Sequence, residues 1–438
     1  MKKLLLLYVI SLPLAGVMTF FNIRDKIQLN DLIFLILTIV FALSVLFGKR
    51  KLHTVSLGYF LILIVVTFMA SNLKAGFTPD IAVEYSGIIY LIVVYCLVFQ
   101  FIDSEIIFWR IINVWAWVSS IIAVVSLLSY IGYYAGLKTG LVSDFGLLGK
   151  ANPAFVIRLT GTFKHPGMFA AYLHVSIVLI SILFFRTKTY SEKALSAAAL
   201  CLCFVAAGLT KTRVIAGIMF TIFLITLRLQ GSRGNSLIKF FSGATAFSTM
   251  LFMLIITVWW IFPITISRDP LTKKRSIKVN LVHQSYFIQH KAALRMTMDY
   301  PVLGVGMGLY NIRSAEYVSW QEAKDPYRIM FPQATEKTDN FYRKGFDPHS
   351  TYLGWAAETG LAGLFSIMVF FTAVICVLNK GRAFSSAAGN VFHIFLAGIF
   401  GFLFNALYLD ILTMRHFWLM LVFGVSYYNL IVNKEKAV

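Results

Sequence analysis

Apolar runs long enough to cross a membrane occupy most of this chain. A membrane-spanning helix needs about 20 mostly apolar residues. Of the 438 residues, 59% are hydrophobic and 13% charged, against about 45–50% and about 25% in soluble domains. This excess excludes an ordinary cytosolic enzyme and a disordered chain, and it predicts an all-α integral membrane protein with about 12 transmembrane helices. We expect the spans at about residues 4–21, 31–47, 55–71, 84–102, 106–134, 167–185, 194–209, 212–229, 240–262, 351–378, 391–409 and 412–433.

The basic residues predict the orientation of the bundle. Short cytoplasmic connections of membrane proteins are enriched in Lys and Arg. The connections on one side are basic, namely 49–51, 186–193, 228–239, 380–382 and 434–436, and only 103–105 breaks the pattern. We therefore expect both termini in the cytoplasm. Much of the net charge of +20 is expected from basic cytoplasmic connections, and it does not indicate nucleic-acid binding, because the bases form no compact domain.

One long segment separates two groups of spans. We expect transmembrane helices 1–9 in residues 1–262, an extracytoplasmic loop with short helices in 263–350 and transmembrane helices 10–12 in 351–438. The loop has 13 Lys and Arg against eight Asp and Glu. Two explanations stay open: an anionic partner on the outer face, or solubility combined with attraction to anionic lipid headgroups.

An amphipathic helix is predicted inside the loop. Over residues 283–299, Lys291 and Arg295 fall on one polar stripe at helical spacing. Such a helix suits the membrane surface, with its apolar side toward the bilayer and its cations toward a site. Pro301 ends it.

Charged groups at span ends are informative because burying them near lipid is costly. The predicted outer side collects five such clusters, at 158–166, 211–213, 291 and 295, 347–350, and 415–416. Arg213 begins a span, where a cation opposes the helix dipole unless an anion binds there too. The alternative is that Arg213 and its neighbour Lys211 extend toward lipid headgroups.

Histidine is the natural candidate base in these clusters. His349 lies two residues after Asp347 at a helix start. An imidazole titrates near pH 6.5, so it can take a proton from a hydroxyl at neutral pH. The alternative is a packed histidine with a structural hydrogen bond. His165 has the same ambiguity, because the following Pro166 also suits a helix cap.

Four stretches together resemble the O-antigen ligase and polymerase superfamily of bacterial envelope glycan enzymes. They are 158–172 (RLTGTFKHPGMFAAY), 209–217 (LTKTRVIAG), 299–310 (DYPVLGVGMGLY) and 348–363 (PHSTYLGWAAETGLAG). The last, a His-polar-x-x-Leu run followed by Glu-x-Gly, is the most specific. The resemblance implies a glycosyltransferase in the bacterial cytoplasmic (inner) membrane. It would pass a glycan from a polyprenyl diphosphate to a hydroxyl acceptor, such as a lipid A-core sugar, beyond the outer leaflet.

The resemblance also implies roles for single residues. His349 would activate the acceptor, and cations would hold the diphosphate. These cations are Arg158, Lys211, Arg213 and one of Lys291 and Arg295, with His165 beside them. Asp347, Glu358 and Arg415 would support the site.

The reaction can be expected to proceed without a metal or cofactor. A leaving diphosphate needs its charge neutralised, either by a metal or by fixed cations. The chain has no Asp-x-Asp pair and has cations at the required depth. A hydroxyl attacking opposite the diphosphate inverts the anomeric carbon. The sequence leaves open a polysaccharide polymerase, transfer to protein Ser or Thr, and a glycan or lipid transporter, for which His174 and Asn405 are the polar residues near mid-span.

Overall fold

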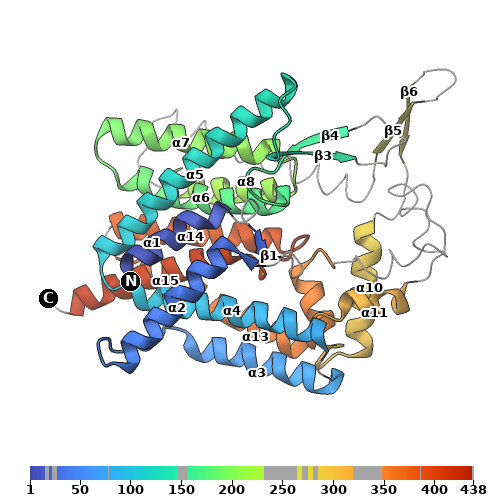
Figure 1. The fold of residues 1–438 in the computed structure, drawn as a ribbon, viewed down its shortest axis with the longest axis horizontal. Coiled ribbons are helices and arrows are strands. Elements are labelled where there is room, and N and C mark those ends of the chain that lie inside the picture. Colours follow the sequence, from blue (N-terminus) through green and yellow to red (C-terminus); the bar gives the residue numbers. More distant parts are fainter. Residues whose placement is uncertain are drawn as a thin grey trace.

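The computed structural model is a helical bundle. It describes residues 1–14, 19–21, 27–76, 78–146, 155–230, 264–268, 275–279, 285–318, 348–384 and 386–436. The long helices run roughly side by side, with both marked termini at one end and α10 and α11 at the other (Figure 1). We call these the terminus end and the site end.

The N-terminal half supplies eight helices and two hairpins among the described residues. The helices are α1 (Lys2–Ser11), α2 (Leu29–Leu46), α3 (Gly58–Ala75), α4 (Pro79–Phe101), α5 (Glu105–Tyr134), α6 (Pro166–Arg186), α7 (Tyr190–Leu209) and α8 (Val214–Gln230). Strands β1 (Thr19–Phe21) and β2 (Ile27–Gln28) pair antiparallel, as do β3 (Val142–Gly146) and β4 (Phe155–Leu159). In the second hairpin, Ser143 is opposite Arg158.

The C-terminal half begins with a third hairpin and short helices. Strands β5 (Ile264–Arg268) and β6 (Arg275–Val279) pair antiparallel. The helices are α10 (Ser285–Asp299), α11 (Tyr310–Tyr317), α13 (Thr351–Gly381), α14 (Ser386–Asn405) and α15 (Arg415–Lys436). The expected loop helix is therefore observed as α10.

The expected membrane architecture is confirmed in part. Within the described ranges, seven helices are long and apolar enough to cross a membrane, namely α2, α4, α5, α6, α7, α13 and α14. Helices α3 and α8 are shorter but also apolar. Among the described residues of the first expected span, 4–21, the α-helix is the ten-residue α1, and the span at 240–262 lies outside the described residues. The three hairpins were not expected.

The core of the bundle forms around α6, which is buried along most of its length. Polar side chains inside the core are hydrogen-bonded between helices. His174 Nε2 lies 2.7 Å from Thr221 Oγ1 of α8, and the Trp115 indole donates to Ser176 Oγ at 3.0 Å. Because such groups are costly to leave unsatisfied away from water, these bonds fix how the helices pack.

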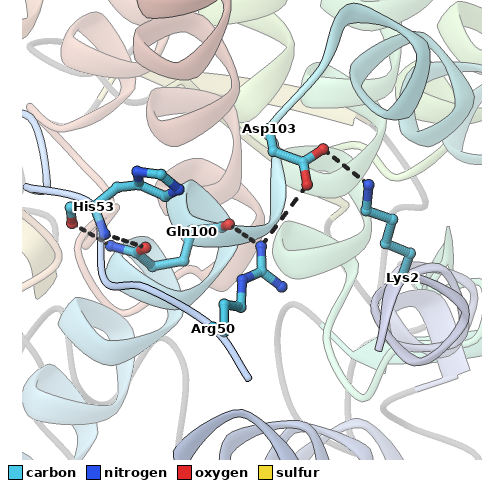
Figure 2. A network of polar contacts seen from close by, with 5 residues as sticks. All are labelled: Lys2, Arg50, His53, Gln100 and Asp103. Atoms are coloured by element: carbon cyan, nitrogen blue, oxygen red, sulfur yellow. Dashed lines mark hydrogen bonds and ion pairs between the residues drawn. The ribbon is translucent and has the colours of Figure 1, made fainter. Parts of the chain in front are cut away.

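The acidic connection 103–105 has local partners at the terminus end. Asp103 lies 2.9 Å from Lys2 Nζ and 3.9 Å from Arg50, and the Arg50 side chain also donates to the Gln100 backbone (Figure 2). Glu105 lies 3.1 Å from Lys434 Nζ. The two acids that break the basic pattern are thus ion-paired with basic residues from other connections.

Candidate active site

The candidate site lies at the site end, where three helix N-termini meet a hairpin and α10. Helix α6 begins at Pro166, α8 at Val214 and α13 at Thr351. A helix N-terminus carries unpaired N–H groups and partial positive charge. The positive ends of the three helix dipoles therefore favour an anion here, while caps on α6 and α13 occupy some of the N-terminal N–H groups.

Arg213 is placed by a tight turn between α7 and α8. Thr210 Oγ1 donates to the Ala207 backbone at 2.6 Å and lies 3.0 Å from Thr212 Oγ1. Lys211 has a φ of 49°, which closes the turn in the left-handed region. Arg213 then follows directly before α8 and is half-buried, while the Lys211 side chain is exposed. Arg213 is therefore the more buried of the two cations, and Lys211 is the one that reaches solvent or lipid headgroups.

A second turn holds His349 in front of α13. Its φ is 46°. The next two residues anchor it: Ser350 caps α13 by accepting from the Leu353 N–H (3.4 Å), and the Thr351 N–H donates to Ala406 O (2.9 Å). In the described chain only Leu57, Lys211 and His349 combine a side chain with a positive φ. Two of the three are candidate site residues, as expected where backbone strain serves a site.

The electrostatics show that the predicted residues converge. Burial, first of all, and then the positive charge of Arg213 and the neighbouring His165 and His290 together lower the pKa of His349 to about 4. These groups come from α13, α8, α6 and α10, which are far apart in sequence. His349 is therefore neutral at pH 7 and lies beside a fixed cation.

His290 is the member of this group that sequence reasoning missed. It lies on α10, one residue before Lys291, and is buried. Backbone groups of His349 and Pro348 hydrogen-bond its imidazole. Burial lowers the pKa of His290, and Arg213 lowers it further, against the effect of these hydrogen bonds. In the sequence, the one sign that His290 belongs to the site is its position next to Lys291, which lies on the predicted cationic stripe.

His165 and Arg158 form the other side of the cluster. His165 Nδ1 accepts a hydrogen bond from the Gly167 N–H at 3.1 Å, so this histidine caps α6. Partial burial lowers the pKa of His165, and the positive charge of Arg158 on β4 lowers it further. A neutral ring is required for the cap, because Nδ1 must carry no proton to accept.

The glycine-rich segment 301–309 docks onto a break in α13. Gly360 has a φ of 69° and a ψ of −175°, which interrupts the helix. The freed carbonyls of Ala357 and Glu358 accept from Val305 and Gly306, both at 2.9 Å. The freed N–H groups of Leu361 and Ala362 donate to Pro301 O (2.8 Å) and Val302 O (3.2 Å).

Glu358 has a structural bond at this junction. Its Oε1 accepts from the Tyr310 N–H (3.1 Å) at the start of α11. Its backbone carbonyl also accepts from Ser71 Oγ of α3 at 2.8 Å. Glu358 therefore ties α11 and α3 to the part of α13 that follows His349. The span expected over 351–378 is thus two helical segments, of which the first belongs to the site.

The contacts that are described for the other predicted residues lie outside the His349 cluster. Arg295 donates to Tyr317 O (2.6 Å) and so holds the end of α11. Arg415 pairs with Asp31 of α2 at 2.8 Å and lies over the Tyr90 ring. Lys291 is half-buried on α10. Asp347 lies outside the described residues.

A polar cavity of about 170 Å³ lies beside the His349 turn. Pro348 and Ser350, which flank His349, line it, together with Trp355 of α13. The remaining lining includes three carboxylates and an amide, namely Glu84, Asn311, Glu358 and Asp410. Its acidic character contrasts with the basic cluster of Arg158 and Arg213.

The three clustered histidines do not form a metal centre. Across the ranges that the structure describes, no group of three or more His, Cys, Asp or Glu side chains is arranged to hold a metal ion.

Comparison with known families gives a match for the middle of the chain. The model of the O-antigen ligase family matches residues 175–368. The chain carries an O-antigen ligase domain. No curated protein matches the chain. The family match and the apolar helices together support a multi-pass membrane protein.

The matched ligase domain contains most of the clustered residues. Arg213, His290, His349 and Glu358 lie within it. Arg158 and His165 precede the matched segment, and Arg415 follows it. The cluster around His349 therefore extends beyond the matched region on its N-terminal side, through His165 and Arg158.

Proposed function

We propose that this protein is an O-antigen ligase-type glycosyltransferase. It moves a glycan from a polyprenyl diphosphate carrier to a hydroxyl acceptor, a lipid A-core sugar, on the outer face of the bacterial cytoplasmic membrane. Both termini are then cytoplasmic. The observation that carries the proposal is the neutral imidazole of His349 beside the fixed charge of Arg213.

The donor occupies the basic side of the site. Arg213 and Arg158 bind the diphosphate, because guanidinium N–H groups favour phosphate oxygens, and the positive ends of the α6 and α8 dipoles add to the attraction. Lys211 and Lys291 add positive charge at the rim. Fixed cations neutralise the leaving group, so the proposed transfer needs no metal.

His349 acts as the base. The acceptor hydroxyl attacks the anomeric carbon and its proton passes to the imidazole. The bond between that carbon and the diphosphate oxygen breaks, and the diphosphate leaves with the electron pair. One displacement inverts the configuration. Donor binding aids the step, because phosphate charge offsets the cations that lower the pKa of His349.

The polar cavity beside the His349 turn suits the acceptor. Carboxylates and amides accept hydrogen bonds from sugar hydroxyls, and Trp355 offers an apolar ring face. The cavity adjoins Pro348 and Ser350, so a sugar in it would present a hydroxyl to His349. The basic cluster would thus take the donor and the acidic cavity the acceptor.

A polymerase of the same family is the second candidate, because its acceptor is another hydroxyl of a growing glycan. A transporter is less well supported. His174 and Asn405, the polar residues near mid-span, take part in helix packing: His174 contacts Thr221, and Asn405 Oδ1 accepts from the Gly217 N–H at 3.1 Å.

A transfer assay tests the proposal. The purified full chain would receive a labelled polyprenyl-diphosphate glycan and a lipid A-core acceptor, with and without chelator, and products would be identified by mass. We expect product in both conditions and losses of about 10²–10³ in rate for Arg213→Gln and His349→Gln. Lys138→Gln, an exposed cation in the turn after α5, should match the wild type. Full activity of either site variant overturns that residue's role. Long glycan ladders without the core acceptor would indicate the polymerase.

A further inference from the structure

Three surface hollows meet at Arg186, at the opposite end of the bundle from the active site. Their volumes are about 530, 400 and 460 Å³, and Arg186 lines all of them. The first follows α5, the second lies between α5 and α7, and the third reaches α14 and α15. Arg186 is the last residue of α6. One cationic side chain thus joins three hollows at the terminus end.

The rim of these hollows is positively charged. Arg110, Arg186, Lys188 and Lys193 line it and are exposed. In the described part of the chain, none of these four side chains forms an ion pair. Of the two acids at the rim, Glu105 is paired with Lys434 and Glu192 is the other. The excess positive charge is complementary to an anion.

Trp109 fixes the central cation. The Arg186 guanidinium carbon lies 3.8 Å from the centre of the Trp109 ring, and Trp109 is buried. A cation over an aromatic face is held there electrostatically. A stacked guanidinium still presents its N–H edge, which matches two phosphate oxygens at once. Arg186 is therefore preorganised as a phosphate-binding group.

The second hollow continues along the bundle as an apolar groove. It is lined by Ile180 and Leu183 of α6, Ala116 of α5, and Ala199 and Leu202 of α7. Small side chains on α5 and α7 leave room between the two helices. Trp117, 59% exposed, stands at the junction of the first and second hollows. Tryptophan favours this position in membranes, where one side is apolar and the other polar.

We propose that this region is a binding site for an anionic phospholipid. The phosphate binds Arg186, the neighbouring Arg110, Lys188 and Lys193 add charge, and an acyl chain lies in the groove between α5 and α7. Basic pockets between transmembrane helices bind acidic lipid headgroups by this chemistry. A zwitterionic lipid fits less well, because its ammonium group would face the same four cations. Free phosphate would leave the apolar groove empty.

Lipid binding to the purified full chain tests the proposal. The delipidated protein would be titrated with phosphatidylglycerol or with phosphatidylcholine of the same acyl chains, and bound lipid counted by native mass spectrometry. Inorganic phosphate would serve as a third ligand in thermal unfolding. We expect phosphatidylglycerol to bind at least about fivefold more tightly than phosphatidylcholine. We expect phosphate alone to give no stabilisation.

Variants distinguish this site from general attraction to charge. Arg186→Gln should weaken phosphatidylglycerol binding about five- to tenfold, and the exposed Trp117→Ala should weaken it too. Arg382→Gln is the matched control, since Arg382 is also an exposed arginine at a helix end and bonds only to Asn379 among the contacts described. Equal binding of the two lipids, equal stabilisation by phosphate, or an equal loss in Arg382→Gln would each overturn the proposal. Where Arg186→Gln fails to fold, Trp117→Ala is compared with Arg382→Gln in the same way.

Discussion

The imidazole of His290 donates a hydrogen bond to the backbone of His349. Helix α10 thereby holds the turn that carries the candidate base. Tyr310 strengthens the same attachment, because its hydroxyl donates to Gln289 O on α10 at 2.6 Å while its N–H donates to Glu358 of α13. The loop helix is thus tied to α13 from both sides of the candidate site.

His290→Ala should reduce transfer about tenfold without unfolding the protein. The variant removes one hydrogen-bonding partner of the His349 turn, a loss of about 1 kcal/mol, and so loosens the position of the base. It also removes one of the groups that lower the pKa of His349, so the acid limb of the pH profile should move upward. Steady-state kinetics from pH 4 to 8 measure both effects.

His393→Ala is the control for His290→Ala. His393 Nε2 lies 2.9 Å from Leu224 O and so makes the same kind of bond, but outside the site. It should change the thermal midpoint and leave the pH profile of transfer unchanged. If both variants lose stability equally and neither shifts the acid limb, His290 has a packing role only.

The pH dependence of transfer should reflect the environment of His349. The reaction needs the neutral imidazole, so activity is lost as pH falls through its pKa. Burial and the charges of Arg213, His165 and His290 lower that pKa to about 4. We expect kcat/KM to stay near its maximum between pH 7 and about 5.5, and to fall with a midpoint near 4. Arg213→Gln should move the midpoint upward, because it removes a positive charge. A wild-type midpoint near 6.5 would contradict the burial of a neutral base.

The sequence predicted that charged residues gather at one end of the bundle, because charged side chains are costly inside the bilayer and so lie at the ends of spans. Arg213 and His349 were predicted from their positions at span ends, and the structure brings them together. His290 was missed because it is uncharged at neutral pH and sits beside the more conspicuous Lys291. Its partner, His349, is 59 residues away in the chain, and no local pattern encodes such a contact.

Substitutions at Glu358 separate its structural bond from a chemical role. Glu358→Gln keeps a side-chain oxygen for the Tyr310 N–H and should retain both folding and transfer. Glu358→Ala leaves that N–H, which belongs to a buried residue, without its acceptor and should cost about 1–3 kcal/mol of stability. Thermal unfolding and the transfer assay on both variants provide the test. A Gln variant that folds normally but has no activity would show that the carboxylate charge acts in the reaction.

The break in α13 shows what the apolar pattern could not predict. Residues 351–378 form one apolar run, so the sequence predicted one span. The interruption at Gly360 depends on four backbone bonds to 301–306, a segment about 55 residues earlier. Hydropathy gives no information on such pairing. The β3–β4 hairpin at the site end also escaped prediction. Its strands are short and, in the described chain, pair with each other, so they leave little mark on the hydropathy pattern.

Gly360→Ala should therefore disrupt the junction between α13 and the loop segment. A Cβ at Gly360 would lie 2.2 Å from Val302 O, and the φ of 69° is unfavourable for any residue with a side chain. Gly304 faces the same junction, where a Cβ would lie 2.4 Å from Glu358. The backbone conformation alone costs about 1–3 kcal/mol, and the clash adds to it. We expect a lower thermal midpoint and loss of transfer.

Gly87→Ala is the matched control. Gly87 lies within α4, and a Cβ there would meet nothing within 4 Å. Alanine should leave stability unchanged or raise it by about 0.5–1 kcal/mol, because glycine is the weaker helix former. Thermal unfolding of both variants in the same detergent compares them directly. If Gly360→Ala were as stable and active as Gly87→Ala, the glycine conformation at Gly360 would not be what holds the segment 301–306 against α13.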